Sequence, residues 1–301
     1  MTATTPNAVP AGGRARRQPG RLGELRARLS ASDLAVKVSL GVLGALVLLA
    51  ITAPWLPLPD PRKVDIVNRW APMSWEHLLG TDSNGRDILA RLVWGTRTAL
   101  LGPLVVTLTA VLVGVTLAIV AAWRGGWVDA VVSRLFDVTF AFPGILLALV
   151  SGAVFGIGLT SATIALAIAY MPYVGRVTRA AALAQVRLPY IEALLVQGQT
   201  PLRICVRHLL PNLSRIVLAQ ATVTFGYALV DLAALSFLGL GVQQTTPDWG
   251  VMVAAGQTDI LSGHPQQAVF AGIAIIIAVA AFTVVGERLG EGNTEHGTAL
   301  L

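Results

Sequence analysis

The sequence has few of the residues on which soluble enzymes and metal proteins rely. Its 301 residues include a single cysteine, Cys205, which excludes both an intrachain disulfide framework and a cysteine-based zinc site. There is no Walker A run, so the chain cannot bind ATP in the P-loop manner. Ser151 and Ser236 have no obvious base partner. The four histidines show no metal-ligand spacing: His77, His208, His264 and His296. We therefore expect no catalytic site and no bound metal.

Charge is also scarce. Only 13% of the residues are charged and 54% are hydrophobic, whereas a soluble domain usually has about 25% charged residues. This composition predicts a polytopic membrane protein. The net charge of +6 could suggest a nucleic-acid partner, but the placement of the arginines described below favours membrane topology instead, and no nucleic-acid partner is expected.

Long uncharged stretches predict an all-α chain that crosses the membrane six times. Each span needs about 20 apolar residues, and Gly156–Gly158 is the best turn within the 38-residue uncharged stretch 138–175. Residues 1–37 are basic; we expect disorder over 1–20, a short surface helix over 21–37 and no cleavable signal peptide. A tail follows at 291–301. The transmembrane domain covers 38–290, with spans near 38–56, 99–123, 130–155, 159–181, 213–239 and 268–287.

The positive-inside rule orients these spans. With the N-terminus inside, the inner segments carry sixteen of the 22 Lys and Arg residues. The outer side carries the other six, and the outer loop 241–267 has none. Both termini are then cytoplasmic, and so is the segment that joins the fourth and fifth spans.

That segment, residues 190–211, predicts two short helices that meet at a sharp corner, which we call the knuckle. Pro189 is suited to the first turn of a helix and Gly198 to its end, since glycine accepts a left-handed conformation. Thr200 and Pro201 then start a second helix as N-cap and first residue. Apolar contacts are expected from Ile191, Leu194, Leu195, Leu202, Ile204, Leu209 and Leu210. A knuckle between membrane spans suits docking to a soluble partner; an ordinary cytoplasmic loop helix is the alternative.

The knuckle resembles the EAA loop of ABC-importer permeases, E-A-A-x3-G-x9-I-x-L-P. Leu194 replaces the second alanine of that pattern, and His208 replaces its isoleucine. The resemblance implies the type I ABC-importer permease fold, with the loop acting as a coupling helix that docks into a groove on a cytoplasmic ATPase. The residues that it assigns to ATPase coupling are Glu192, Ala193, Gly198, Arg203, Arg207 and Pro211.

A second pattern precedes the second span. Residues 77–100 read HLLGTDSNGRDILARLVWGTRTAL, and the four charged residues of its first half can pair at helical spacing. The run G-T-D-x-x-G-R-D-x-x-x-R-x-x-x-G-x-R is similar to the hallmark of C-type permease subunits of dipeptide, oligopeptide and nickel importers. We favour structural ion pairs over ligand contacts for this outer hallmark, which comprises Gly80, Asp82, Gly85, Arg86, Asp87 and Arg91.

A third pattern, LSFLGLGVQQTTPDW over residues 235–249, is also similar to that branch. Glycines end the fifth helix here, and an outer loop or re-entrant segment follows to about residue 267. The resemblance implies that the region lines the translocation pathway and faces a binding protein. The candidate pathway residues are Asp231, Ser236, Phe237 and Trp249.

Asp231 lies within the fifth span, where a carboxylate is costly and is a functional candidate by default. At 1.5 Å per residue it lies about 24 Å along the helix from Arg215, near the outer end of the hydrocarbon. Two interpretations stay open at this stage: a residue that faces the pathway, or a solvated residue at the end of the span.

Together these features resemble a permease subunit of a bacterial ABC importer for dipeptides or oligopeptides, in the cytoplasmic membrane. The resemblance implies a homologous B-type permease, two cytoplasmic ATPases that hold ATP and Mg, an extracytoplasmic binding protein, membrane lipid and a peptide substrate. Nickel or glutathione import is the alternative within this class. A secondary transporter driven by an ion gradient is the alternative outside it, but it predicts paired intramembrane charges or inverted repeats, and the sequence shows neither.

Overall fold

The computed structural model describes residues 21–291, so the predicted disorder over 1–20 and the tail residues 292–301 lie outside the described residues. The described part is helical, and its only β-type pairing is an isolated bridge between Thr81 and Asp87. The α-helices are α1 (Arg21–Thr52), α2 (Ile88–Arg124), α3 (Gly126–Phe140), α4 (Gly144–Phe155), α5 (Leu159–Val186), α6 (Pro189–Val196), α7 (Pro201–Ile204), α8 (Leu210–Phe237), α9 (Trp249–Leu261) and α10 (Gln266–Glu291).

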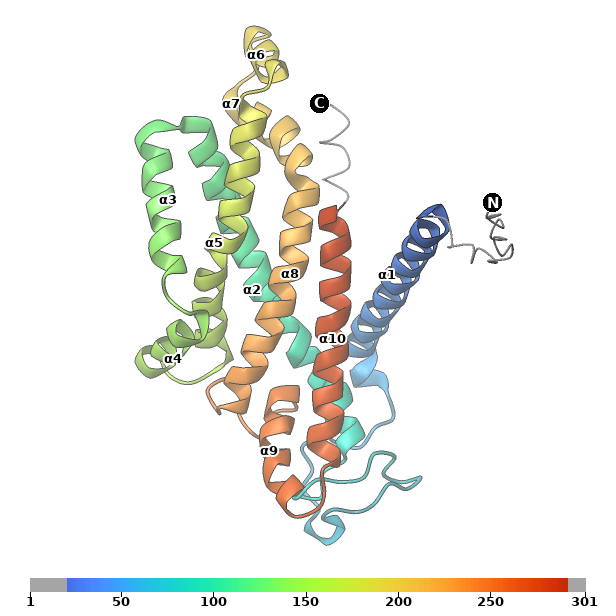
Figure 1. The fold of residues 1–301 in the computed structure, drawn as a ribbon. Coiled ribbons are helices and arrows are strands. Elements are labelled where there is room, and N and C mark those ends of the chain that lie inside the picture. The colour runs from blue at the N-terminus through green and yellow to red at the C-terminus, as the bar shows by residue number, and fades with distance from the viewer. Residues whose placement is uncertain (1–20, 292–301) are drawn as a thin grey trace, which may run out of the picture.

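Four long helices, α2, α5, α8 and α10, form the body of the molecule. Helix α2 runs obliquely across the body and packs against α5 and α8, while α10 packs against α8 and α9 (Figure 1). One core cluster joins α2, α4, α5 and α8 through residues such as Val106, Leu166 and Leu235.

Small residues let the helices approach closely at two crossings. A β-carbon on Gly114 of α2 would lie 2.7 Å from the Met171 carbonyl of α5, and one on Gly175 of α5 would lie 2.4 Å from the Phe136 ring of α3. Helices in membranes pack by such close contacts, because lipid supplies no hydrophobic driving force between them.

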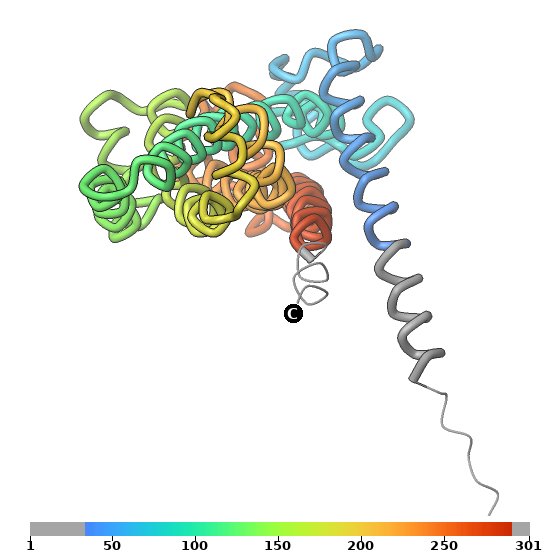
Figure 2. Tube along the Cα trace, turned by 90° about the horizontal axis from the view of Figure 1, so that it is seen from above, coloured from blue at the N-terminus to red at the C-terminus, as the bar shows by residue number. Residues whose placement is uncertain are grey.

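Helix α1 diverges from the body toward the end of the molecule where the knuckle lies (Figures 1 and 2). It contacts α10 and α2, but only 6% of its most apolar window is buried. The surface helix predicted over 21–37 and the first span form one helix, because no glycine or proline lies between Gly23 and Gly41 to end it.

The single helix predicted over 130–155 is instead two helices, α3 and α4, bent by 83°. Helix α3 ends at Phe140, and Pro143 is the N-cap of α4. Proline lacks the N–H of a helix interior and disfavours the helical conformation of the preceding residue, here Phe142. The sequence interpretation had discounted this Phe-Pro pair as a helix end, and the structure corrects it.

Within the described residues, four helical runs are long and apolar enough to cross a membrane, or five if α3 and α4 together form one span. Helix α5 has 28 residues, which at 1.5 Å each is about 42 Å and enough for a crossing by length. Six spans therefore stay a prediction. The predicted outer loop 241–267 contains a helix of its own, α9, packed against α8 and α10.

The two ends of the molecule differ. The knuckle, the start of α1 and the end of α10 lie at one end, and α4, α9 and the segment 56–87 lie at the other (Figure 1). We call these the knuckle end and the cap end. The described chain ends thus lie on the same side as the knuckle.

Candidate functional site

The knuckle is built as the sequence predicts. Pro189 opens α6, and the chain turns at Gly198, whose φ is +78°. The turn is closed by two backbone hydrogen bonds, from Gly198 N–H to the Leu195 carbonyl (2.9 Å) and from Gln199 N–H to the Leu194 carbonyl (3.1 Å). Thr200 is the N-cap of α7, with Pro201 in its first turn, although the threonine side chain makes no capping hydrogen bond.

The second helix of the knuckle is not a separate short helix. It passes through a π-helical turn, Cys205–Leu209, into α8, so that residues 201–237 form one helical run. Leu210 donates its N–H to the Cys205 carbonyl five residues earlier. A turn of this kind accommodates Pro211, which has no N–H to donate within a helix. The knuckle is therefore the end of α8 itself, and a force on it acts directly along that helix.

Only part of the knuckle's apolar surface is buried. Ile191, Ile204 and Leu209 are buried, as expected. Four apolar side chains of the knuckle are exposed: Leu195, Val196, Leu202 and Val206. Leu210 is also exposed, so none of Leu195, Leu202 and Leu210 is buried within this chain. Exposed apolar side chains on an element that projects from the bundle are candidates for contact with a partner.

Charged residues surround this surface. Glu192 lies in the first turn of α6, and Arg203 and Arg207 are one turn apart on the second helix; all three are exposed. None of the three forms an ion pair with another described residue. Ala193 and Pro211 are exposed as well. The residues expected to couple to a partner are thus all exposed on the knuckle.

The base of the knuckle is fixed to three helices. Leu209 and Leu213 of the second helix pack with Ala122 of α2 and Ala182 of α5. Tyr190 donates to Gln185 (3.1 Å) and accepts from Asn212 (3.3 Å). These contacts join the knuckle to α2, α5 and α8, so a displacement of the knuckle must move the bundle with it.

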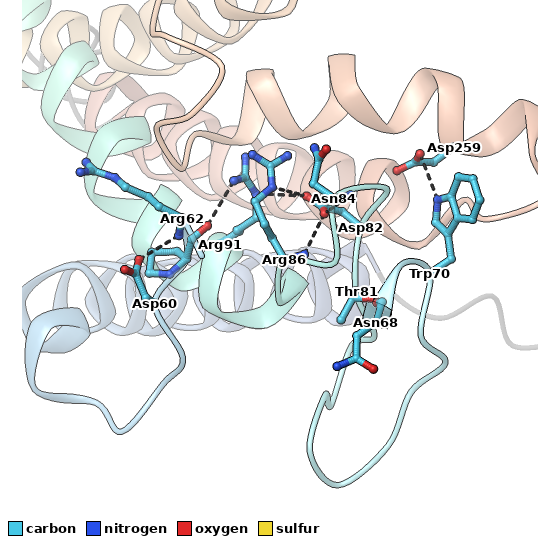
Figure 3. Close-up of polar contacts among 11 residues, drawn as sticks. Asp60, Arg62, Asn68, Trp70, Thr81, Asp82, Asn84, Arg86, Arg91 and Asp259 are labelled. Carbon is cyan, nitrogen blue, oxygen red and sulfur yellow. Dashed lines mark hydrogen bonds and ion pairs between the residues drawn. The ribbon is translucent and has the colours of Figure 1, made fainter. Parts of the chain in front are cut away.

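At the cap end, Asp82 organises the outer hallmark (Figure 3). Its carboxylate accepts N–H groups from Asn84 (2.8 Å) and Arg86 (2.9 Å) and pairs with the Arg86 guanidinium at 2.7 Å. The guanidinium of Arg91 lies 3.8 Å away, and it also donates to the Pro61 carbonyl (3.3 Å). Asp82, Arg86 and Arg91 are all buried.

The pairing differs from the one expected from helical spacing. Asp87 does not pair with Arg91; it caps α2 by accepting the Ala90 N–H (2.7 Å), and it contacts His77 Nδ1 at 2.9 Å. The reason is that α2 begins only at Ile88, so the residues before it follow loop geometry. Gly80 and Gly85 have positive φ angles of +78° and +72°.

The segment 56–87 is also tied to α9, a contact that the sequence did not reveal. Trp70 donates its indole N–H to Asp259 (3.2 Å) and stacks on His264 at a centroid distance of 4.9 Å. Asp259 and His264 both lie at least 189 residues after Trp70 in the sequence, so no local sequence pattern links them to it.

Trp249 and Ser236, two of the candidate pathway residues, are buried within this chain. Trp249 packs on Gly95 and donates to the Leu92 carbonyl (3.0 Å), so it holds α9 against α2. Ser236 hydrogen-bonds the Asp248 side chain, and burial raises the pKa of the Asp248 carboxyl. Phe237, in contrast, is 41% exposed.

Asp231 lies in an open notch where α3 gives way to α4. Its Oδ2 accepts a hydrogen bond from the Tyr170 hydroxyl of α5 (2.7 Å). The half-buried carboxylate therefore faces neighbouring helices and the notch, and is not a freely solvated end residue.

Two ion pairs hold α3 to α5 nearer the knuckle end. Arg176 pairs with Asp137 at 2.7 Å, and Arg179 forms a two-pronged pair with Asp129, both bonds 2.5 Å. Within residues 21–291, no group of three or more His, Cys, Asp or Glu residues could hold a metal ion.

Comparison with known proteins agrees with this arrangement. Residues 114–291 match the family described as binding-protein-dependent transport system inner membrane component. The chain is 37% identical to a dipeptide transport system permease protein, DppC, of Alkalihalophilus pseudofirmus, over 87% of this chain and 86% of that protein. It is 35% identical to a di/tripeptide transport system permease protein, DppC, of Pseudomonas aeruginosa, over 83% and 86% of the two chains.

Two further similarities bear on substrate and fold. A glutathione transport system permease protein, GsiD, of Pectobacterium atrosepticum is 37% identical over 71% of this chain and 70% of that protein. Among solved structures, an inward-facing conformation of the MetNI methionine ABC transporter matches with a TM-score of 0.55 at 20% identity. It covers 68% of this chain and 97% of that chain. At that identity, the match supports the fold alone.

Proposed function

The chain belongs to the family of binding-protein-dependent transport system inner membrane components, and we propose that it is one permease subunit of an ATP-driven importer for dipeptides and oligopeptides. Its most similar relatives include dipeptide and di/tripeptide permeases that align over more than four fifths of the chain. It forms half of a translocation pathway and supplies no catalytic residue of its own.

The observation that carries this proposal is the knuckle. It projects beyond the helix bundle, exposes four apolar side chains with Glu192, Arg203 and Arg207 around them, and continues directly into α8. A cytoplasmic ATPase that buries this apolar surface gains stability, and the surrounding charges fix the orientation of docking. ATP and Mg bind to that partner.

The assembly contains this chain, a homologous B-type permease, two ATPases and an extracytoplasmic binding protein. When ATP brings the ATPases together, the two knuckles approach each other. Because Leu209 and Leu213 pack against α2 and α5, the movement passes into the bundle as a rigid-body shift. That shift opens the pathway between the two permeases toward the binding protein.

We propose six spans in the bacterial cytoplasmic membrane, with both termini and the knuckle in the cytoplasm. The charge bias supports this orientation, as does the position of the described chain ends on the knuckle side of the body. The cap end, with α9 and the paired charges of the outer hallmark, then faces the binding protein. Asp231 and Phe237 are the pathway residues that this proposal retains.

Glutathione is the second candidate substrate, because a glutathione permease is as similar in identity as the dipeptide permease, over a shorter alignment. Nickel import has no such relative among these matches. An ion-gradient transporter is disfavoured by the family to which the chain belongs.

Uptake by a reconstituted complex tests the function. The complex purified through a tag on this chain is placed in proteoliposomes with its binding protein, and labelled Ala-Phe or glutathione is offered outside. Uptake of Ala-Phe that requires ATP on the ATPase side, and that proceeds without any ion gradient, is the expected result. Uptake driven by a proton or sodium gradient without ATP would contradict the proposal, and uptake of glutathione alone would favour the second candidate.

A further inference from the structure

The notch at Asp231 is a cavity of about 510 Å³ between the α3–α4 break and the helices α5 and α8. Its walls carry aromatic side chains and a single acidic group. The residues that line it and that matter here are Phe140, Phe142, Tyr170, Tyr173, Tyr227 and Asp231.

The negative charge in this notch is not balanced by a cation. Among the described residues, Tyr170 is the one hydrogen-bond partner of Asp231, and it is neutral. Helix α4 begins beside the carboxylate, since a β-carbon on Gly144 would lie 3.8 Å from Oδ2. By contrast, Asp129 and Asp137 each pair with an arginine of α5. Of these three carboxylates, Asp231 is thus the one available to a cation from outside the described chain.

The aromatic rings are arranged around this charge. Tyr173 lies 4.7 Å from the Phe140 ring and 5.5 Å from the Tyr170 ring, centroid to centroid. Tyr227 is one helical turn before Asp231 on α8, hence on the same face. Arg176 already lies over Phe140 at 4.4 Å, whereas no cation of the described residues lies over the ring of Tyr173 or Tyr227. Aromatic faces beside a carboxylate attract an ammonium group.

The notch does not have the character of a lipid-facing surface. Tyr173 and Tyr227 are 43% and 56% exposed, and neither hydroxyl has a hydrogen-bond partner among the described residues. A tyrosine hydroxyl at membrane depth needs such a partner, and an ionisable group there marks a pathway or a bundle interior. The exposed face of α10, with Ile273, Ile276 and Ile277, shows what a lipid-facing surface of this chain carries instead.

We propose that this notch is a binding site for the α-ammonium group of the peptide in transit, with Asp231 as counter-ion and Tyr173 and Tyr227 as ring faces. The proposal rests on the proposed function, since it places the notch on the pathway. It adds a selection step within the membrane: a peptide with a free amino terminus is held, and one with a blocked amino terminus is not.

The test measures binding to the permease without the binding protein, which has its own selectivity. The complex is purified through a tag on this chain in nanodiscs and titrated with Ala-Phe and with N-acetyl-Ala-Phe, both without nucleotide and with a non-hydrolysable ATP analogue. Saturation-transfer NMR gives the two dissociation constants. In at least one state, wild-type complex should bind Ala-Phe at least about tenfold more tightly, because acetylation removes a charge-assisted contact.

Asp231→Asn should reduce this preference to about twofold or less, since the amide still accepts the Tyr170 hydrogen bond but has no charge. Tyr227→Leu should weaken Ala-Phe binding without affecting N-acetyl-Ala-Phe. Asp137→Asn is the matched control and should keep the wild-type preference, because Asp137 is already paired with Arg176.

Three results would overturn the inference. The first is equal binding of the two peptides to the wild-type complex, or no binding of either peptide. The second is a preference for Ala-Phe that persists in Asp231→Asn, and the third is loss of the partner permease from the Asp231→Asn complex. The last result would assign the notch to a cation of the partner subunit. ATP-driven uptake by the wild-type complex is measured in parallel. If the wild-type complex takes up the peptide and any of these three results is found, the ammonium site alone is rejected. If ATP-driven uptake is absent, the proposed function is rejected.

Discussion

At the scale of single residues, Gly85 illustrates how closely the cap end is packed. Its φ is +72°, and a β-carbon there would lie 1.6 Å from the Asp65 carbonyl oxygen. Gly263 has a similar φ of +84°, but open space surrounds it. An alanine at Gly263 would therefore be destabilised only by its backbone conformation, whereas an alanine at Gly85 would also collide with neighbouring backbone.

Gly85→Ala should lower the thermal stability of the purified complex clearly more than Gly263→Ala. The control change carries only the conformational penalty of about 1–2 kcal/mol, whereas Gly85→Ala must also displace backbone at Asp65. Scanning fluorimetry of the two variants measures the difference. Equal shifts in Tm would show that the backbone around Asp65 can move away from the new β-carbon at little cost in stability.

Arg86 tests whether the outer hallmark has a structural role. Its guanidinium neutralises the buried Asp82 carboxylate, and removal of one partner from a buried pair costs about 3–5 kcal/mol. Arg86→Ala should therefore reduce the amount of assembled complex, with uptake per assembled complex nearly unchanged. Arg62 lies in the same segment but is exposed, so Arg62→Ala is the control variant. Normal assembly with lost uptake would instead assign Arg86 to substrate transfer or docking.

At the scale of elements, one buried side chain joins α9 to α2. Trp249 is 1% exposed and bridges α9 to the start of α2. Loss of a buried tryptophan side chain costs about 3–5 kcal/mol. Trp249→Ala should thus increase amide hydrogen exchange in α9 and in the first turns of α2.

Leu261→Ala provides the control for that experiment, because Leu261 lies in the same helix and is 86% exposed. It should leave exchange unchanged, and neither variant should affect α6. An unchanged pattern in Trp249→Ala would mean that α9 is held by its contacts with α8 and α10 alone.

Local sequence signals predicted the elements that they control directly. Pro189, Gly198 and Pro201 specify the knuckle, because each acts on its own backbone geometry. The break at Pro143 was discounted, although proline chemistry predicts it, because a long uncharged stretch favoured one continuous helix. The extent of the second knuckle helix was also missed, since a π-helical turn has no clear sequence signature.

Tertiary partners could not be predicted in the same way. The hydrogen bond between Tyr170 and Asp231 joins residues 61 positions apart, and the one between Trp70 and Asp259 joins residues 189 positions apart. Both depend on how the helices pack. The burial of Trp249 and Ser236 has the same cause, and the resemblance alone had placed them on the pathway. The charge pattern, a property of the whole chain, predicts the orientation of both termini, which stays a prediction.

At the scale of the whole molecule, the orientation of the two ends can be measured with cysteine labelling. In a Cys205→Ser background, Ser262→Cys at the cap end should react with an impermeant maleimide in intact cells. Gln197→Cys on the knuckle should react only after permeabilisation. Both positions are exposed, so accessibility within the protein does not limit either reaction. The reverse labelling pattern would place the knuckle outside and contradict the coupling role.

The central claim is that the knuckle connects this chain to an ATPase. Glu192→Lys reverses the charge beside the exposed apolar surface, and Gly198→Val imposes a side chain at a φ of +78°, which strains the corner by about 1 kcal/mol or more. At the cap end, Ser262→Lys introduces the same cationic side chain at an exposed position, and Gly263→Val repeats the glycine change at a φ of +84° in open space.

The most direct measurement is the amount of ATPase that copurifies with the tagged, membrane-inserted permease pair. We predict that Glu192→Lys and Gly198→Val each lower it by at least about tenfold, as expected for loss of well-packed interface contacts worth about 1.4 kcal/mol or more. The pair of permeases should remain intact, and both controls should retain the ATPase. Wild-type ATPase levels on both knuckle variants would contradict the account.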